Sequence, residues 1–76
     1  MKELLETLAK AIVDNPDDVK VTVVEGDRSV ILQITVNPDD VGKIIGKQGR
    51  IAKALRSIIK AVAVKENKKA IVEIID

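Results

Sequence analysis

GKIIGKQGRIAKALRSIIK, residues 42–60, is the stretch that decides the fold: Gly46 and Gly49 enclose Lys47 and Gln48, and an amphipathic helix follows at once. The stretch contains cations throughout and no acid. Glycine allows a sharp backbone turn or a close approach to a ligand. The first amides of the following helix lack intrahelical acceptors and the helix dipole is positive there, so an anion is favoured. These features predict a turn that clamps a phosphate backbone.

The composition is poor in catalytic groups. The 76 residues predict one small domain, residues 1–76, and they include no Cys and no His. The chain therefore lacks a thiol nucleophile, a zinc site of the usual type and a general base that titrates near neutral pH. We expect neither an enzyme nor a cofactor or metal site.

No part of the sequence predicts a membrane segment. No apolar run approaches the roughly 18 residues of a membrane span, and MKELLETL, residues 1–8, is unlike a signal peptide. We therefore expect a cytoplasmic protein.

Charge is distributed unevenly, although the formal net charge is only +1. Residues 1–42 hold 4 cations and 9 acids, whereas residues 43–69 hold 9 cations and 1 acid. One concentrated basic segment indicates a localised anionic partner. A solvated basic helix face is the alternative that charge alone leaves open.

Before this stretch, the sequence predicts a helix and a β-hairpin. Residues 2–13 repeat apolar side chains at steps of three and four, which is typical of a helix with one buried stripe. Residues 19–25 and 29–36 are rich in Val, Ile and Thr and are separated by turn residues, which predicts two strands. The helix stripe is expected to comprise Leu4, Leu5, Leu8, Ala11 and Ile12, and the inward face of the second strand Val30, Leu32, Ile34 and Val36.

Asn37-Pro38-Asp39-Asp40 marks the start of a short helix that ends before Gly46. Asn is a good N-cap, Pro suits the first helical position, and the helix dipole favours acids in the first turn. This helix-start chemistry accounts for the two acids without a catalytic role. Gly42 within the helix costs about 1 kcal/mol relative to Ala, which predicts a close packing contact there. The apolar face is expected to comprise Val41, Ile44 and Ile45.

The helix after the glycine turn is predicted over residues 50–64. Its main apolar stripe comprises Ile51, Leu55, Ile58 and Val62, with Ala54 and Ala61 beside it. A second apolar line, Ala52, Ile59 and Ala63, indicates either a wide buried face or a self-association surface. After a polar loop at 65–69, residues 70–75 alternate as a strand, with Ala70, Val72 and Ile74 on one face.

The element order is therefore α-β-β-α-α-β. The crossover from the second strand through two helices to the third most simply joins adjacent parallel strands. We predict an α+β fold in which a three-stranded mixed sheet has its helices packed on one face.

Two nucleotide-binding motifs do not fit this sequence. A phosphate loop needs four residues between its glycines and Lys-Ser or Lys-Thr after the second, whereas three separate Gly42 from Gly46, and Gln48 follows Lys47. A dinucleotide fingerprint is absent because no G-x-G precedes the helix.

What does match is IIGKQGRIAKAL, residues 44–55, which resembles the I-G-x-x-G helix-turn-helix of the KH domain. The element order is similar to the bacterial, type II KH fold. Over essentially its full length the chain resembles the KhpA family of stand-alone KH-domain proteins. The segments that carry this resemblance are AIVDNPDDV (11–19), VNPDDVGKIIGKQGRIAKALRSIIKA (36–61) and VEIID (72–76).

The resemblance implies a non-enzymatic protein that binds single-stranded RNA and acts as an RNA chaperone or post-transcriptional regulator. In such domains the loop grips the sugar-phosphate backbone of about four nucleotides while the bases lie in an adjacent apolar groove. Residues 65–69 would form the variable loop on the other rim of that groove. The RNA-binding residues are expected to be Lys43, Ile45, Gly46, Lys47, Gln48, Gly49, Arg50 and Lys53.

Three other positions on the helix are expected to modify this site. Arg56 and Lys60 lie one and two turns further along the helix than Lys53 and are expected to contribute only long-range attraction. The broad KH pattern has a large aliphatic residue where this chain has Ala52, which bears on the shape of the groove.

The chain contains no aromatic residue. Stacking of bases on aromatic rings, which contributes about 1–3 kcal/mol per base, is therefore not available to it. Affinity must come from cations, backbone amides and aliphatic contacts, which predicts weak, salt-sensitive binding with little sequence selectivity.

A protein-interaction module is the competing function. In that interpretation either the line Ala52, Ile59 and Ala63 or the outer sheet face around Ile31, Ile71 and Ile75 docks a partner. The partner implied by the resemblance is a second copy, giving a homodimer, or a larger KH-domain protein, giving a heterodimer. Pairing would also raise RNA affinity through effective concentration.

Overall fold

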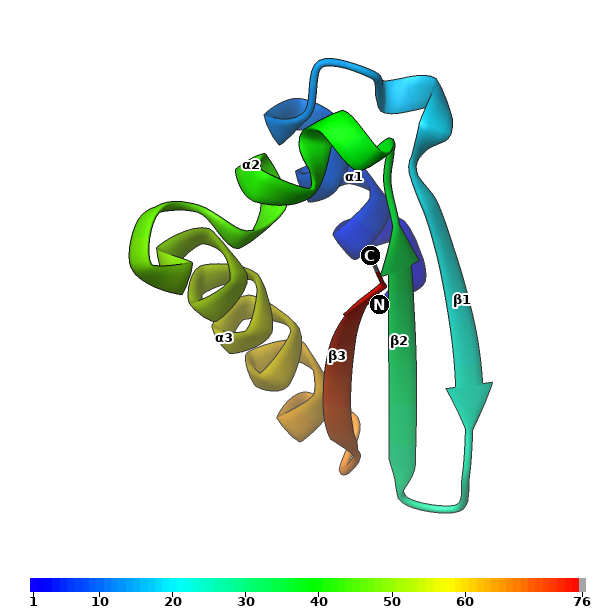
Figure 1. The fold of residues 1–76 in the computed structure, drawn as a ribbon. Helices are drawn as coiled ribbons and strands as arrows, with labels where there is room; N and C mark the ends of the chain where they lie inside the picture. The colour runs from blue at the N-terminus through cyan, green and yellow to red at the C-terminus, as the bar shows by residue number, and fades with distance from the viewer. Residues whose placement is uncertain (76) are drawn as a thin grey trace.

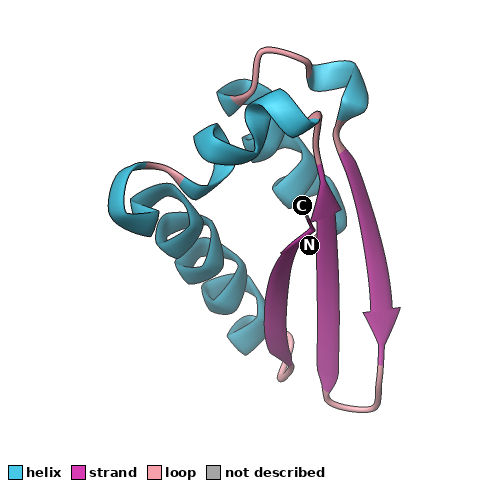
Figure 2. Ribbon diagram, in the orientation of Figure 1, coloured by secondary structure: helices cyan, strands magenta, loops and turns pink. Residues whose placement is uncertain are grey.

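The sheet has the predicted strand order and directions. The computed structural model describes residues 1–75. In it β1 (Lys20–Glu25) pairs antiparallel with β2 (Ser29–Thr35), and β3 (Lys69–Ile75) pairs parallel with the other edge of β2. The helices are α1 (Lys2–Ile12), α2 (Val41–Ile45) and α3 (Arg50–Lys65). They lie on one face of the sheet (Figures 1 and 2). The α+β class and the mixed three-stranded sheet are therefore confirmed.

The core lies between the inner sheet face and the helices. Alternate residues of β2 and Val36, which follows it, are buried as predicted, with exposures of 1% for Val30, 0% for Leu32 and Ile34, and 6% for Val36. From α1 the buried residues are Leu5 and Ala9, whereas Ala11 is exposed. The prediction for Ala11 is wrong because it lies about 200° around the helix from Ala9.

α3 packs on the sheet with a wide apolar face, which includes Leu55 of the main stripe and the whole second apolar line. Ala52, Leu55, Ile59 and Ala63 are buried, whereas Ile58 is 41% exposed. The two apolar lines are adjacent positions, about 100° apart on the helix, so periodicity alone does not choose between them. Of the other residues predicted for the main stripe and its edge, Ile51 and Val62 are half-buried, whereas Ala54 and Ala61 are exposed. A self-association surface at Ala52, Ile59 and Ala63 is therefore wrong.

Two copies of the tetrapeptide Asn-Pro-Asp-Asp, residues 15–18 and 37–40, connect the turn before β1 to the start of α2. Each forms a short 3-10 turn, Pro16–Asp18 in one and Pro38–Asp40 in the other. The Asn15 amide and its Nδ2 donate to Asp40 Oδ2 at 3.0 and 3.1 Å. In return, Asn37 Nδ2 donates to Asp18 Oδ2 at 2.9 Å. We call this reciprocal pairing the NPDD clasp.

Asp40 is the buried charge of the clasp. Its side chain is fully buried and also accepts the Asp14 amide at 3.3 Å, while Lys43 Nζ lies 3.5 Å from Oδ1. Burial by itself raises the pKa of Asp40, but the hydrogen bonds from Asn15 and Asp14, together with Lys43, outweigh it and hold the pKa below its ordinary value of 3.8. Helix-start chemistry is thus only part of what this acid does.

The predicted N-cap at Asn37 is confirmed, but it caps the 3-10 turn Pro38–Asp40 that leads into α2, and Asp40, the N-cap of α2 itself, makes no side-chain cap hydrogen bond. The predicted contact at Gly42 is wrong. The Asn37 side chain accepts the Asp39 amide at 2.9 Å, as an N-cap residue does. At Gly42, no heavy atom of the described residues outside its own neighbourhood in the helix lies within 4 Å of where a Cβ would stand. Ile44 is fully buried and anchors α2 in the core, whereas Ile45 is 39% exposed. The exposed Ile45 faces the site described next.

Candidate nucleic-acid interface

The site is built around the turn between α2 and α3, which projects away from the sheet (Figure 1). α2 ends where the Gly46 amide donates to Gly42 O at 2.8 Å, and the Gly49 amide donates back to Gly46 O at 3.1 Å. Gly46, Gln48 and Gly49 all have positive φ, at 76°, 58° and 73°. The loop Gly46–Gly49 therefore has the sharp bend that the sequence predicts.

The two glycines are required for different reasons. Gly46 has φ 76° and ψ 174°, a region that is essentially restricted to glycine. A Cβ there would also lie 2.3 Å from Ile51 Cγ1 and 2.9 Å from the Ile51 amide nitrogen. Gly49 is left-handed with ψ 14°, and a Cβ there would meet no atom of the described residues within 4 Å. Close packing of Ile51 therefore explains why position 46 requires glycine, but it does not explain the glycine at position 49.

The backbone after the loop suits an anion. Gly49 is left-handed and Arg50 is right-handed, with φ −64° and ψ −39°. Consecutive residues of opposite hand direct their amides to the same side and form an anion-binding concavity. The Gly49 and Arg50 amides already donate to Gly46 O and Lys47 O within the turn. Among the described residues no side chain caps the start of α3, and the helix dipole adds positive potential there.

Cations surround this concavity. Lys47, Arg50 and Lys53 have exposed side chains, and Arg50 Nη2 donates to Gln48 Oε1 at 3.3 Å across the turn. Lys43 is different, because its Nζ is ion-paired with Asp14 and Asp40. The hydrogen bond with Asp14 raises the pKa of Lys43. The structure therefore gathers three of the four predicted basic residues at the turn and ties the fourth to carboxylates.

A groove leads from the loop along α3 and β3. Its first cavity, about 330 Å³, is lined by Ile45, Gly49, Ala52, Lys53, Arg56 and Ile74. Ala52 is 4% exposed and forms part of the wall, so its small side chain leaves room that a larger aliphatic residue would fill. We call this cavity the loop pocket. It combines an apolar surface with two cations, as a site for a base and its phosphate requires.

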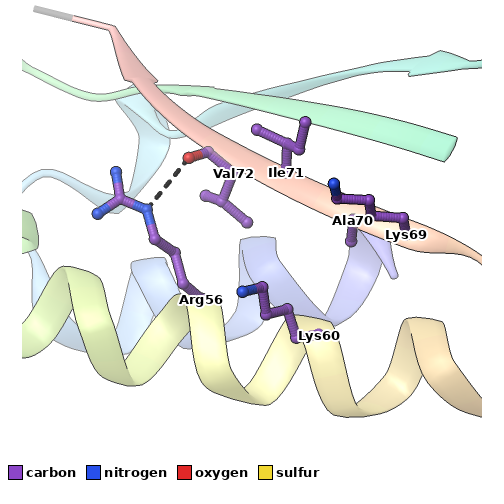
Figure 3. Close-up of a pocket in the computed structure, with 6 residues that line it drawn as sticks. All are labelled: Arg56, Lys60, Lys69, Ala70, Ile71 and Val72. Carbon is purple, nitrogen blue, oxygen red and sulfur yellow. Dashed lines mark hydrogen bonds between the residues drawn. The ribbon is translucent and has the colours of Figure 1, made fainter.

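Arg56 lines the groove, whereas the sequence predicts only long-range attraction for it. Its Nε donates to Val72 O at 3.3 Å, so the side chain bridges α3 and β3 (Figure 3). The available signal was its place two turns after Gly49 on the face that also holds Lys53. The spacing along the helix does not show that β3 lies opposite Arg56 and forms the second wall of the groove.

Two features are absent from the part of the chain that the structure describes. No group of three or more Asp, Glu, His or Cys side chains in residues 1–75 is arranged to hold a metal ion. In the same residues, no helix is both long enough and apolar enough to cross a membrane.

Comparisons with known proteins agree on one family. The family model described as KhpA/KhpB, KH domain, matches residues 2–74. The RNA-binding protein KhpA of Clostridium acetobutylicum is 64% identical over 75 residues, covering 99% of this chain and 100% of the relative. The KhpA protein of Clostridium perfringens is 61% identical, covering 99% of this chain and 100% of the relative. The KhpA protein of Aquifex aeolicus is 46% identical, covering 100% of this chain and 96% of the relative. No solved structure matches the chain.

Proposed function

Because the chain belongs to the KhpA/KhpB family of KH domains, we propose that it binds single-stranded RNA without catalysis, through the loop Gly46–Gly49. The observation that supports this most directly is the backbone of that loop. Its left-handed Gly49 precedes an uncapped helix start, and cations flank both. A phosphate at this point would be attracted by Lys47, by Arg50 and by the positive end of the dipole of α3.

The loop pocket is the proposed site for the base attached to that phosphate. Ile45, Ala52 and Ile74 offer aliphatic surface, and Lys53 lies on the rim. Since the chain has no aromatic side chain, the bases are held by aliphatic contact and hydrogen bonds rather than by stacking on rings. We assign Lys43 to the clasp rather than to direct RNA contact, because two carboxylates already neutralise it.

The double variant Lys47→Asp/Gln48→Asp tests the loop. Asp is tolerated in left-handed conformations better than most residues, so the backbone at Gln48 is preserved. We expect far-UV circular dichroism to stay unchanged while fluorescence anisotropy shows loss of binding to a labelled oligouridylate. The control Lys2→Asp/Thr7→Asp makes the same change in charge at exposed positions of α1. Undiminished affinity in the folded loop variant, or equal loss in the control, would refute the assignment.

The cellular role that follows is post-transcriptional. Binding that depends on backbone contacts more than on base identity suits a protein that acts on many RNAs in the cytoplasm, as an RNA chaperone or regulator. Crosslinking in cells followed by sequencing of bound RNA checks this, with the loop double variant as control. Recovery of the same RNAs by the variant would contradict it.

A second candidate function is pairing with another copy or with a KhpB-type protein. Val24, Ile31 and Ile71 lie at one level across the three strands on the outer sheet face. Val24 is 54% and Ile71 is 46% exposed. Such an apolar row without cover suits a contact surface. Light scattering of the wild type beside Ile71→Lys tests it, since a monomer in both cases removes self-pairing through this face.

A further inference from the structure

We infer that the NPDD clasp positions the loop Gly46–Gly49 for RNA, because it sets the direction of α2, from which the loop leaves. The positioning residues are Asn15, Asp18, Asn37 and Asp40. They lie outside the loop and outside the loop pocket. This inference rests on the proposed function.

α2 has too few buried contacts of its own to fix its direction. It consists of only five residues, Val41–Ile45, and isolated helices shorter than about 12 residues are marginal in water. Ile44 is the one fully buried side chain of α2. Val41 is half-buried, and Gly42 and Ile45 are exposed. One fully buried side chain holds a helix against the core but does not by itself fix its tilt, so a second attachment is needed.

The clasp provides that attachment at the first end of α2. Asp40 immediately precedes α2, where an acid commonly accepts amides of its own helix. Its carboxylate makes no such cap bond. It accepts the amides of Asp14 and Asn15 and the Asn15 side chain instead, from a turn 25 and 26 residues earlier in the chain. Figure 1 shows this turn, which follows α1, at the same end of the molecule as the start of α2. The carboxylate therefore fixes α2 to another part of the fold rather than capping it.

The other half of the clasp lies three residues before Asp40. Asn37 Nδ2 donates to Asp18 Oδ2 at 2.9 Å, so the segment that leads into α2 is attached at both of its ends. Two attachments oppose a tilt that one alone would allow. Lys43 also pairs with Asp14, but these side chains are 45% and 73% exposed. Exposed ion pairs contribute little, so Lys43 is not counted among the positioning residues.

A small tilt of α2 would misplace the loop. Gly46 lies about 9 Å along the axis from Asp40, at about 1.5 Å per residue, so a tilt of about 10° would displace it by about 1.6 Å. Binding groups need to be held within about 0.5 Å of their working position. The far end of the loop is held separately, because α3 begins at Arg50 and buries Ala52 and Leu55. The clasp therefore controls how the loop spans the two helices.

The test removes the side-chain bonds of the clasp from the side that is remote from the loop. Asn15→Ala/Asp18→Ala deletes both bonds, while the backbone amides of Asp14 and Asn15 still satisfy Asp40, so this clasp variant should fold. Asp17→Ala is the charge control, because it removes the same charge from the same exposed turn. Val30→Ala is the stability control, because Val30 is buried at the opposite end of β2 from α2.

Two measurements are made at a temperature at which every protein is folded. In NMR spectra of the free proteins, the amide signals of Gly46 and Gly49 should move in the clasp variant and stay in place in both controls. In fluorescence anisotropy, a labelled oligouridylate should bind the clasp variant at least about threefold more weakly than the wild type, since apparent affinity falls with the fraction of molecules whose loop is correctly placed. Both controls should bind it as the wild type does.

The positioning role would be overturned by loop signals that stay in place in the clasp variant, by wild-type affinity in that variant, or by an equal loss of affinity in either control. Failure of the proposed function itself would be distinguishable, because Lys47→Asp/Gln48→Asp would then leave the affinity unchanged. The loop signals of the free clasp variant report on positioning without any RNA.

Discussion

Exchange of each loop glycine for asparagine should separate backbone conformation from close packing. Asn is the matched choice because it tolerates positive φ better than most residues. At Gly49 the only cost is the left-handed conformation, about 1 kcal/mol, because an added Cβ meets open space. At Gly46 the backbone lies in a region of φ and ψ that is essentially restricted to glycine, which costs another residue about 1–3 kcal/mol of stability. The added Cβ also collides with Ile51.

The collision at Gly46 cannot be relieved by a rotation of a side-chain end. Besides Ile51 Cγ1 at 2.3 Å, the added Cβ would lie 2.8 Å from Ile51 Cβ and 2.9 Å from its amide nitrogen. The first turn of α3 itself would have to shift. We therefore expect a total cost of at least about 3 kcal/mol for Gly46→Asn. The stability of a domain of this size is only about 4–11 kcal/mol.

Thermal unfolding followed by far-UV circular dichroism measures the difference, and the absence of aromatic residues makes this a better probe than protein fluorescence. For a domain of 60–100 residues, 1 kcal/mol corresponds to about 4–8 °C in Tm. Gly49→Asn should therefore lower Tm by about 4–8 °C, and Gly46→Asn by about 12 °C or more. Equal decreases, or a larger decrease at Gly49, would refute the packing argument.

Three substitutions in and beside α2 have equally definite expected outcomes. Gly42→Ala should raise stability in urea unfolding by about 1 kcal/mol, since it replaces glycine in an exposed helix without a clash; a decrease would reveal a contact there. Asp40→Asn should lower the urea midpoint at neutral pH. Because the folded pKa of Asp40 lies below its unfolded value, the contribution of Asp40 to stability is complete above about pH 3.8 and is lost as pH falls through the folded pKa. A stability advantage of the wild type that persists in strong acid would contradict this assignment. Lys43→Gln should lower Tm but change RNA affinity by less than about twofold; a decrease as large as that of Lys47→Gln would place Lys43 in the interface.

The spacing of apolar residues was sufficient to predict the fold, because in most elements those residues recur with either helical or strand spacing. The alternation in β2 and the turn residues between the first strands predicted the hairpin. Element boundaries lie within one residue of the structure except at α2, which begins at Val41 after a 3-10 turn at Pro38–Asp40. α3 was the exception. Its two apolar lines are both continuous, and only the position of the sheet decides that Ile59 is buried and Ile58 is not.

The candidate site was predictable as far as it is local in sequence. The sharp turn at Gly46–Gly49 follows from its two glycines, whereas the left-handed conformation of Gln48 does not follow from its residue type. The roles of Arg56 and Lys43 do not, because their partners Val72 and Asp14 lie far along the chain. The same holds for Asp40, although the repetition of Asn-Pro-Asp-Asp was a visible signal of a relation between the two turns.

The parallel pairing of β2 with β3 has a consequence for the order in which the interface forms during synthesis. The glycine loop precedes β3 in the chain, yet β3 supplies one wall of the groove through Ile74 and through Lys69–Val72. While a nascent chain still has β3 within the ribosome, it carries the loop without the opposite wall. The complete groove therefore arises only after β3 has left the exit tunnel.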